Sequence, residues 1–118
     1  MEIMLPWPPA GLSPNKRSHW AVKSKLAKSY RESCRSSVIS TLFPVAPEFT
    51  EGKIHLFIDF FPPDKRHRDD DNCYAAFKSG RDGLADALGV NDRRFISHPC
   101  LRDTVVPGGS VRVRITQE

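Results

Sequence analysis

The segment from residue 71 to residue 88 constrains the fold of this chain more than any other stretch. Wound as an α-helix at about 100° per residue, it places Asp71, Lys78 and Asp82 within roughly 60° of one another. The opposite side is apolar or small, and it consists of Cys73, Ala76, Phe77, Gly80, Leu84, Ala87 and Leu88. Such a stripe is typical of a helix that packs on a core. The sequence therefore predicts a helix with one buried face and one charged face.

Three consecutive aspartates, residues 69–71, stand at the start of this helix. One aspartate suffices as an N-cap, and negative charge near a helix N-terminus is favoured by about 0.3 to 1 kcal/mol. Adjacent carboxylates repel one another unless a cation neutralises them. Aspartate oxygens without a cysteine or histidine pair at zinc spacing favour Mg²⁺ or Mn²⁺ over Zn²⁺. The cluster therefore predicts a divalent-metal site, with Mg²⁺ as the expected ion and Mn²⁺ as a possible substitute.

The acidic cluster directly follows a basic run, Lys65-Arg66-His67-Arg68. The whole chain carries 18 Lys and Arg against 14 Asp and Glu, which gives a net charge of +4. Basic surface binds the phosphates of polyanions, and an acidic pocket inside it suits a bound metal ion. An irregular loop over residues 10–19, with Lys16 and Arg17, could also contact phosphate. This distribution of charge points to a nucleic-acid partner.

The length of the chain and its cysteines indicate how many domains it has and where in the cell it acts. A chain of 118 residues is expected to form one domain, residues 1–118. The cysteines at 34, 73 and 100 show no CxxC spacing, which favours reduced thiols in a cytoplasmic protein. The sequence shows neither a signal peptide nor an apolar run of membrane length. We therefore expect a soluble cytoplasmic protein that does not act at a membrane.

Hydrophobic periodicity divides the chain into alternating strands and helices. The order β-α-β-α-β-β predicts an α/β (α+β) fold, in which two main helices pack on a mixed β-sheet that ends in a hairpin. Prolines confine the first strand to a sheet edge. The expected elements are strands at 3–7, 53–60, 95–106 and 111–115, helices at 20–42 and 71–88, and a turn at 107–109.

Three motifs resemble the RusA family of Holliday junction resolvases: Leu5-Pro6-Trp7-Pro8-Pro9, Arg68-Asp69-Asp70-Asp71-Asn72, and Asp92 in a Gly-x-Asn-Asp loop. The resemblance spans most of the chain. It implies a small α/β homodimer, commonly encoded by phages and prophages, that binds four-way DNA junctions and cuts two strands symmetrically with Mg²⁺. It also implies that Asp69, Asp71 and Asp92 bind the metal ion, and that Asp70 is a variable middle residue.

The chain departs from the best-known form of the motif at one position, where Ala75 replaces a lysine. Lys78, seven residues after Asp71, returns to the same helix face and is expected to take the role of that lysine. Asp69 and Asp71 would point to one side if their segment were extended. Asp82 and Asp86 remain alternatives to Asp92 as the third ligand, and Asp70 is expected to be a cap or a solvated residue.

These residues predict metal-assisted hydrolysis of a phosphodiester, with Lys78 on the scissile phosphate. Two alternatives stay open: a metal-dependent nuclease that acts on linear, flapped or other branched DNA, and a non-catalytic DNA-binding module whose aspartates only cap a helix. Specificity in the resolvase reading would come from junction shape, since contacts to phosphates carry no sequence information. The residues expected to grip flanking phosphates are Lys16, Arg17, Lys65, Arg66 and Arg68.

Overall fold

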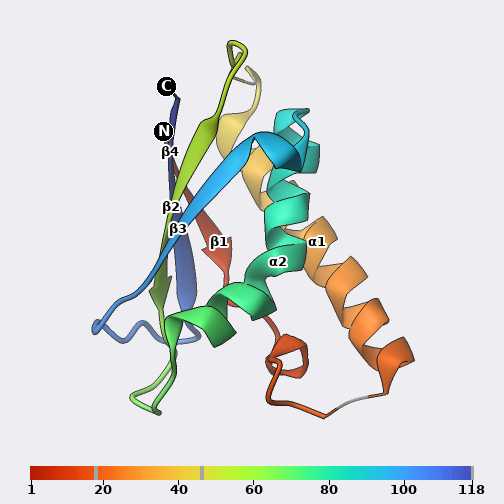
Figure 1. Ribbon diagram of the computed structural model, residues 1–118, viewed down its shortest axis with the longest axis vertical. Helices are drawn as coiled ribbons and strands as arrows, with labels where there is room; N and C mark the ends of the chain where they lie inside the picture. The colour runs from red at the N-terminus through yellow and green to blue at the C-terminus, as the bar shows by residue number, and fades with distance from the viewer. Residues whose placement is uncertain (18, 46, 118) are drawn as a thin grey trace.

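Alternating apolar residues in the strands and apolar stripes in the helices build one sheet with both helices on a single face (Figure 1). The computed structural model describes residues 1–17, 19–45 and 47–117; Ser18 of the expected loop, Ala46 and Glu118 lie outside the described residues. The predicted α+β fold and its order are confirmed. The elements are β1 (Glu2–Pro6), η1 (Ala10–Leu12), α1 (Trp20–Leu42), β2 (Ile54–Phe61), α2 (Asp70–Leu88), η2 (Asp92–Arg94), β3 (Phe95–Leu101) and β4 (Ser110–Gln117).

The sheet has the strand order β1-β4-β2-β3. β2 and β3 are parallel because α2 carries the chain back across the sheet between them, whereas β4 is antiparallel to both β2 and β1. The expected terminal hairpin was therefore wrong, because β4 enters between β1 and β2 and does not pair with β3. β3 ends at Leu101, earlier than expected, and its Pro99 is tolerated because β3 is an edge strand.

The core lies between the sheet and the two helices. Alternate residues of β2, from Ile54 to Phe60, are fully buried against Phe77 and Leu84 of α2. On α1, the Tyr30 hydroxyl donates to the Pro6 carbonyl at 2.6 Å, which fixes the helix against the end of β1. Burial raises the pKa of the nearby Cys34 thiol to about 11, so this thiol stays protonated at neutral pH.

The two helices make their closest approach at glycines of α2. A Cβ atom on Gly83 would lie 2.2 Å from the backbone oxygen of Arg31 on α1, and one on Gly80 would lie 2.7 Å from the Tyr30 ring. The same helix pair is joined by Arg31 and Asp86, whose side chains form two hydrogen bonds of 2.7 and 2.8 Å. In the described part of the chain, neither helix is long and apolar enough to cross a bilayer.

The other face of the sheet is not covered by any helix of the described residues (Figure 1). Its centre is Asp59 of β2, whose side chain is only 1% exposed because Arg102, Arg112 and Arg114 surround it. Burial raises the pKa of the Asp59 carboxyl, but hydrogen bonds from Arg102 and Arg112 outweigh this effect, so the pKa lies below its ordinary value. Asp59 is therefore a buried, charged residue that contributes to the stability of the fold.

The Asp59→Asn variant is expected to lose about 2 to 3 kcal/mol of stability at neutral pH, because charge-assisted hydrogen bonds are lost in a buried site. Since folding lowers the pKa of Asp59, its contribution is complete above about pH 4 and disappears as the pH falls through the folded-state value. The stability gap between wild type and variant should therefore shrink as the pH falls below about 4. Urea unfolding at several pH values measures it. An exposed control, Asp103→Asn, should unfold at the wild-type urea concentration at neutral pH, and a gap for Asp59→Asn that stays constant with pH would contradict the assignment.

Candidate functional site

Asp69 is the N-cap of α2. Its backbone is extended, with φ −126° and ψ 161°, and its carboxylate accepts from the Asn72 backbone N–H at 2.8 Å and from the Asn72 side-chain amide at 3.1 Å. Asp71 already lies in the first helical turn. The segment is thus not extended through Asp71, so the condition for a strand-like alignment of Asp69 and Asp71 is not met, and it is the helix start that positions both carboxylates.

Asp70 has a structural role that the sequence did not reveal. Its carboxylate accepts from the backbone N–H of Leu101 at 2.9 Å, which ties the start of α2 to the end of β3. Asp70 is exposed, as expected of a solvated residue, and this hydrogen bond is an additional role. Asp71 is exposed, and no hydrogen bond or ion pair reaches its carboxylate from the described residues. Both oxygens of the Asp71 carboxylate are consequently available to a ligand.

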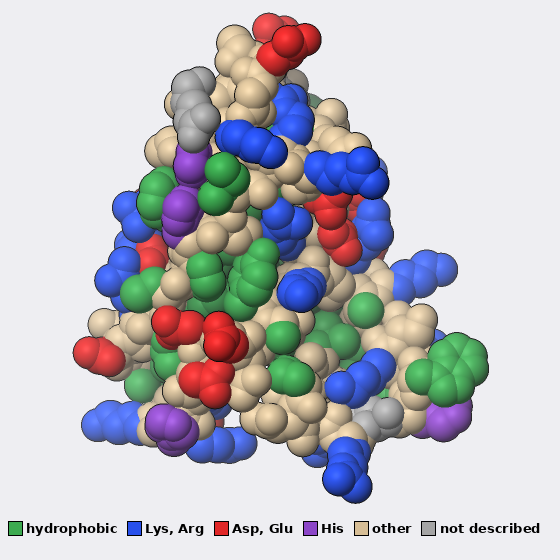
Figure 2. Space-filling view, viewed as in Figure 1, with side chains coloured by type: hydrophobic (Ala, Val, Ile, Leu, Met, Phe, Trp, Pro, Cys, Tyr) green, Lys and Arg blue, Asp and Glu red, His purple; other side chains and the backbone are tan. Residues whose placement is uncertain are grey.

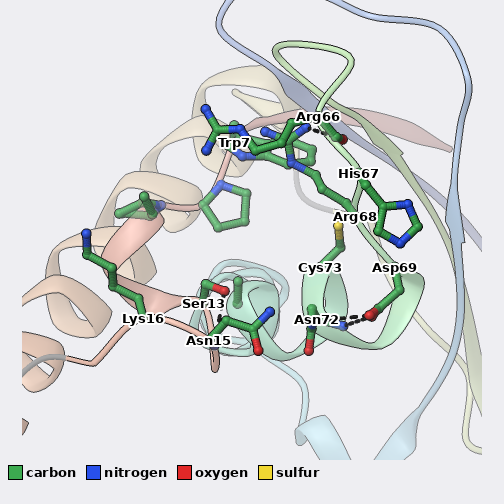
Figure 3. Close-up of a pocket in the computed structure, with 14 residues that line it drawn as sticks. Trp7, Ser13, Asn15, Lys16, Arg66, His67, Arg68, Asp69, Asn72 and Cys73 are labelled. Atoms are coloured by element: carbon green, nitrogen blue, oxygen red, sulfur yellow. Dashed lines mark hydrogen bonds between the residues drawn. The ribbon is translucent and has the colours of Figure 1, made fainter.

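A pocket of about 450 Å³ lies between the loop that follows β1 and the start of α2. Figure 3 shows its two walls, with Trp7 and Lys16 from the loop on one side and Asp69 and Asn72 from the helix start on the other. Arg66 also lines this pocket. The fold thus brings cations from two distant segments to the same pocket as a carboxylate of the acidic cluster.

The predicted phosphate-binding cations fall into two groups. Arg68 is only 18% exposed and donates to Asp64 at 2.8 Å, and its guanidinium lies 5.8 Å from the centre of the Trp7 ring. Arg68 therefore holds the loop between β2 and α2, and its hydrogen bond lowers the pKa of Asp64. The remaining cations are exposed, and Figure 2 shows basic side chains over this loop beside the carboxylates at the start of α2. They are Lys16, Arg17, Lys65 and Arg66.

Asp92 lies at the other end of the helix. The 19 residues of α2 span roughly 28 Å at 1.5 Å per residue, and Asp92 follows them. Among the residues that the structure describes, no group of three or more His, Cys, Asp or Glu side chains is placed to hold a metal ion. The predicted ligand set of Asp69, Asp71 and Asp92 is therefore not assembled within one chain.

A second pocket, of about 410 Å³, contains Asp92 together with Asp82 and Asp86. Asp86 is paired with Arg31, and this hydrogen bond lowers the pKa of its carboxyl. Both alternatives for the third ligand thus lie with Asp92, away from the first pocket. Lys78 is exposed on α2, with its Nζ atom 6.0 Å from the centre of the Tyr74 ring, and does not line either pocket.

Sequence reasoning missed Arg81, which holds Asp92 in place. Its side chain is 17% exposed, lies 3.7 Å from the Asp92 carboxylate and donates to the backbone oxygens of Asp92 and Phe95. On the helical wheel Arg81 falls between the charged and the apolar sides, about 80° from Asp71. Only that border position could have drawn attention to it.

Comparison with known proteins identifies a relative of this chain but no activity. No family model matches the sequence. A protein of Xylella fastidiosa (strain Temecula1 / ATCC 700964), described as an uncharacterized protein, is 44% identical over 119 residues, which cover 97% of this chain and 74% of the relative. The chain belongs to the family of this protein. Since its description names no activity, the function has to be argued from the site.

The donor chemistry of the α2 start fits Mg²⁺. Both Asp69 and Asp71 are exposed and offer hard oxygen ligands. Asp69 uses one lone pair of each oxygen for Asn72 and keeps others. Mg²⁺ commonly takes only one or two protein carboxylates and fills its other positions with water and substrate phosphate. Asp69 and Asp71 are therefore the residues of one chain that would hold the ion.

Proposed function

We propose that this protein is an Mg²⁺-dependent, structure-specific endodeoxyribonuclease that resolves four-way DNA junctions in the bacterial cytoplasm. The observation that supports this proposal most is the first pocket, which Lys16 and Arg66 of two distant segments line together with Asp69 of the acidic helix start. Cations bind the phosphates of DNA, and carboxylates within them suit a divalent ion. Asp71 lies in the first turn of the same helix, is exposed, and has no partner among the described residues, so it offers a second carboxylate to the ion.

Different residues of this region would have different roles in cleavage. Lys16 and Arg66 would bind phosphates that flank the cleaved bond. These contacts would position the DNA without reading its sequence. Asp69 and Asp71 would hold the ion, which when bound supplies a water of lowered pKa and neutralises charge on the phosphate. Lys78, two turns along α2 on the side of Asp71, would bind a neighbouring phosphate with its long side chain.

A second copy would complete the site. Because α2 separates Asp92 from Asp71 within one chain, Asp92 can act as third ligand only if it comes from a partner. We propose a homodimer in which the Asp92 end of one α2 lies beside the Asp71 end of the other. A two-fold axis then creates two equivalent sites, which matches the paired cuts that a symmetric junction requires.

Cleavage of a synthetic four-way junction, beside the linear duplexes of its arms, tests the proposal. The wild-type protein should introduce paired symmetric nicks into the junction only when Mg²⁺ is present, and should leave the linear duplexes intact. Equal cleavage of junction and duplex would instead favour a nuclease of broader substrate range. Junction binding without cleavage at any Mg²⁺ or Mn²⁺ concentration would leave a DNA-binding module with an acidic helix start.

A further inference from the structure

The open face of the sheet carries three arginines around one buried carboxylate. Arg102 donates to one Asp59 oxygen at 2.8 Å, and Arg112 donates to the other at 2.9 and 3.1 Å. The Nε of Arg114 lies 3.5 Å from that second oxygen. We call Arg102, Arg112 and Arg114 the arginine cluster. One carboxylate balances one of its three charges, so the cluster keeps a surplus of positive charge.

The arginine cluster is both held in place and accessible. The guanidinium carbon of Arg112 lies 5.2 Å from the centre of the Phe61 ring, and that of Arg114 lies 5.4 Å from the centre of the Phe57 ring. The three side chains nevertheless remain 43%, 32% and 44% exposed in chain order. A guanidinium has five N–H donors, and Asp59 takes at most two from any of these three. Oriented donors therefore remain for a ligand with several acceptor oxygens.

The cluster also adjoins the candidate catalytic site. Arg102 directly follows Leu101, whose N–H is bound by Asp70 of the acidic helix start, and its own backbone N–H donates to Phe60 at 2.9 Å. The carboxyl ends of β2 and β3 lie at the same end of the sheet as the first turn of α2 (Figure 1). A chain of phosphates that passes Asp71 can thus continue around the β3 edge to Arg102.

We infer that the arginine cluster is a second phosphate-binding surface, which takes the sugar-phosphate backbone of a DNA arm that leaves the acidic start of α2. The identity of this DNA rests on the proposed function. Guanidinium groups match phosphate oxygens in geometry and charge. A second copy is the poorer occupant, because a two-fold contact through this face would set arginines against arginines while the buried Asp59 offers them no further counter-charge.

Binding of a fluorescently labelled four-way junction in EDTA tests this inference without cleavage. Arg114→Gln and Arg102→Gln should each weaken binding about 3- to 10-fold and lower the slope of log K against log salt by about 0.9, the value for one lost phosphate contact. The matched control is Arg35→Gln on α1, where an arginine of the same 43% exposure pairs with Glu32; it should bind as wild type. A thermal unfolding curve for each variant checks that it is folded.

The outcomes separate this inference from the proposed function. If the wild type cuts junctions but both cluster variants bind with wild-type affinity and slope, the second surface is refuted while the resolvase stands. If the variants lose binding and the wild type never cuts, the surface stands and the resolvase is refuted. Loss of a dimer by Arg114→Gln without DNA, seen by sedimentation, would show that a second copy covers this face. Absence of wild-type binding would also overturn the inference.

Discussion

The Asp71→Asn variant is expected to cut four-way junctions about 100- to 1000-fold more slowly than the wild-type protein, the range found when one charge-stabilising group is removed from an active site. Asparagine keeps the shape of the side chain but lacks the charge that would hold Mg²⁺. Because Asp71 has no partner in the described part of the chain, the fold should lose little stability. Single-turnover cleavage at saturating protein measures the effect.

Glu51→Gln is the matched control for this variant. Glu51 is exposed, precedes β2 and lines neither pocket, so its loss should leave the cleavage rate unchanged. Junction binding should stay within about twofold of wild type for both variants, since neither carboxylate binds phosphate. A wild-type cleavage rate in Asp71→Asn would remove Asp71 from the mechanism.

Mixing two inactive variants shows whether the third ligand comes from a second copy. In a mixed dimer of Asp71→Asn and Asp92→Asn, a site shared between subunits carries either both substitutions or neither. One intact site is thus restored, and the mixture should nick the junction on one strand. A site built within one chain would carry one substitution in each copy, so that no activity would return.

The Gly83→Ala variant is expected to be destabilised by about 3 kcal/mol or more, or to fail to fold. The added Cβ would meet the Arg31 backbone oxygen at 2.2 Å, and a backbone atom inside a helix cannot rotate away as a side chain can. Alanine also favours the helix by about 1 kcal/mol over glycine, but this gain is smaller than the cost of pushing α1 and α2 apart. Urea unfolding followed by circular dichroism measures the difference.

Ser79→Ala serves as the control on the same helix. The Ser79 hydroxyl is buried and finds no hydrogen-bond partner among the described residues. Removing a buried hydroxyl without a partner is neutral or slightly stabilising. An unfolding midpoint for Gly83→Ala as high as that of Ser79→Ala would mean that the two helices separate at little cost.

Local patterns predicted the elements but not their arrangement. The helix from 20 to 42 and the strand that begins near residue 54 were found because apolar spacing and flanking prolines are local signals. The insertion of β4 between β1 and β2 was missed, since strand pairing depends on contacts far apart in sequence. The arginines around Asp59 were missed for the same reason, because Arg102 and Arg112 come from other strands and loops.

The candidate site shows a different limit of prediction from the sequence. Asp69 and Asp71 were recognised from their clustering, and the structure explains how the helix start displays them. Asp92 was joined to them by the family resemblance alone, although the predicted helix between them was already about 27 Å long. That length could have indicated two separate ends from the sequence itself. The role of Asp70 could not, because it depends on where β3 ends.

The hydrogen bond between Asp70 and Leu101 has a consequence for how a substrate would be selected. This hydrogen bond holds the acidic helix start at the end of the edge strand β3. The arginine cluster lies on the opposite face of the sheet at the same place. A straight duplex cannot follow a surface that turns so sharply, so it would engage one face at a time. A branched molecule with arms diverging from one point could engage both, and the second contact would then form at a high effective concentration. Preference for branched DNA would in that case be an avidity effect, and shortening one arm of the junction should remove it.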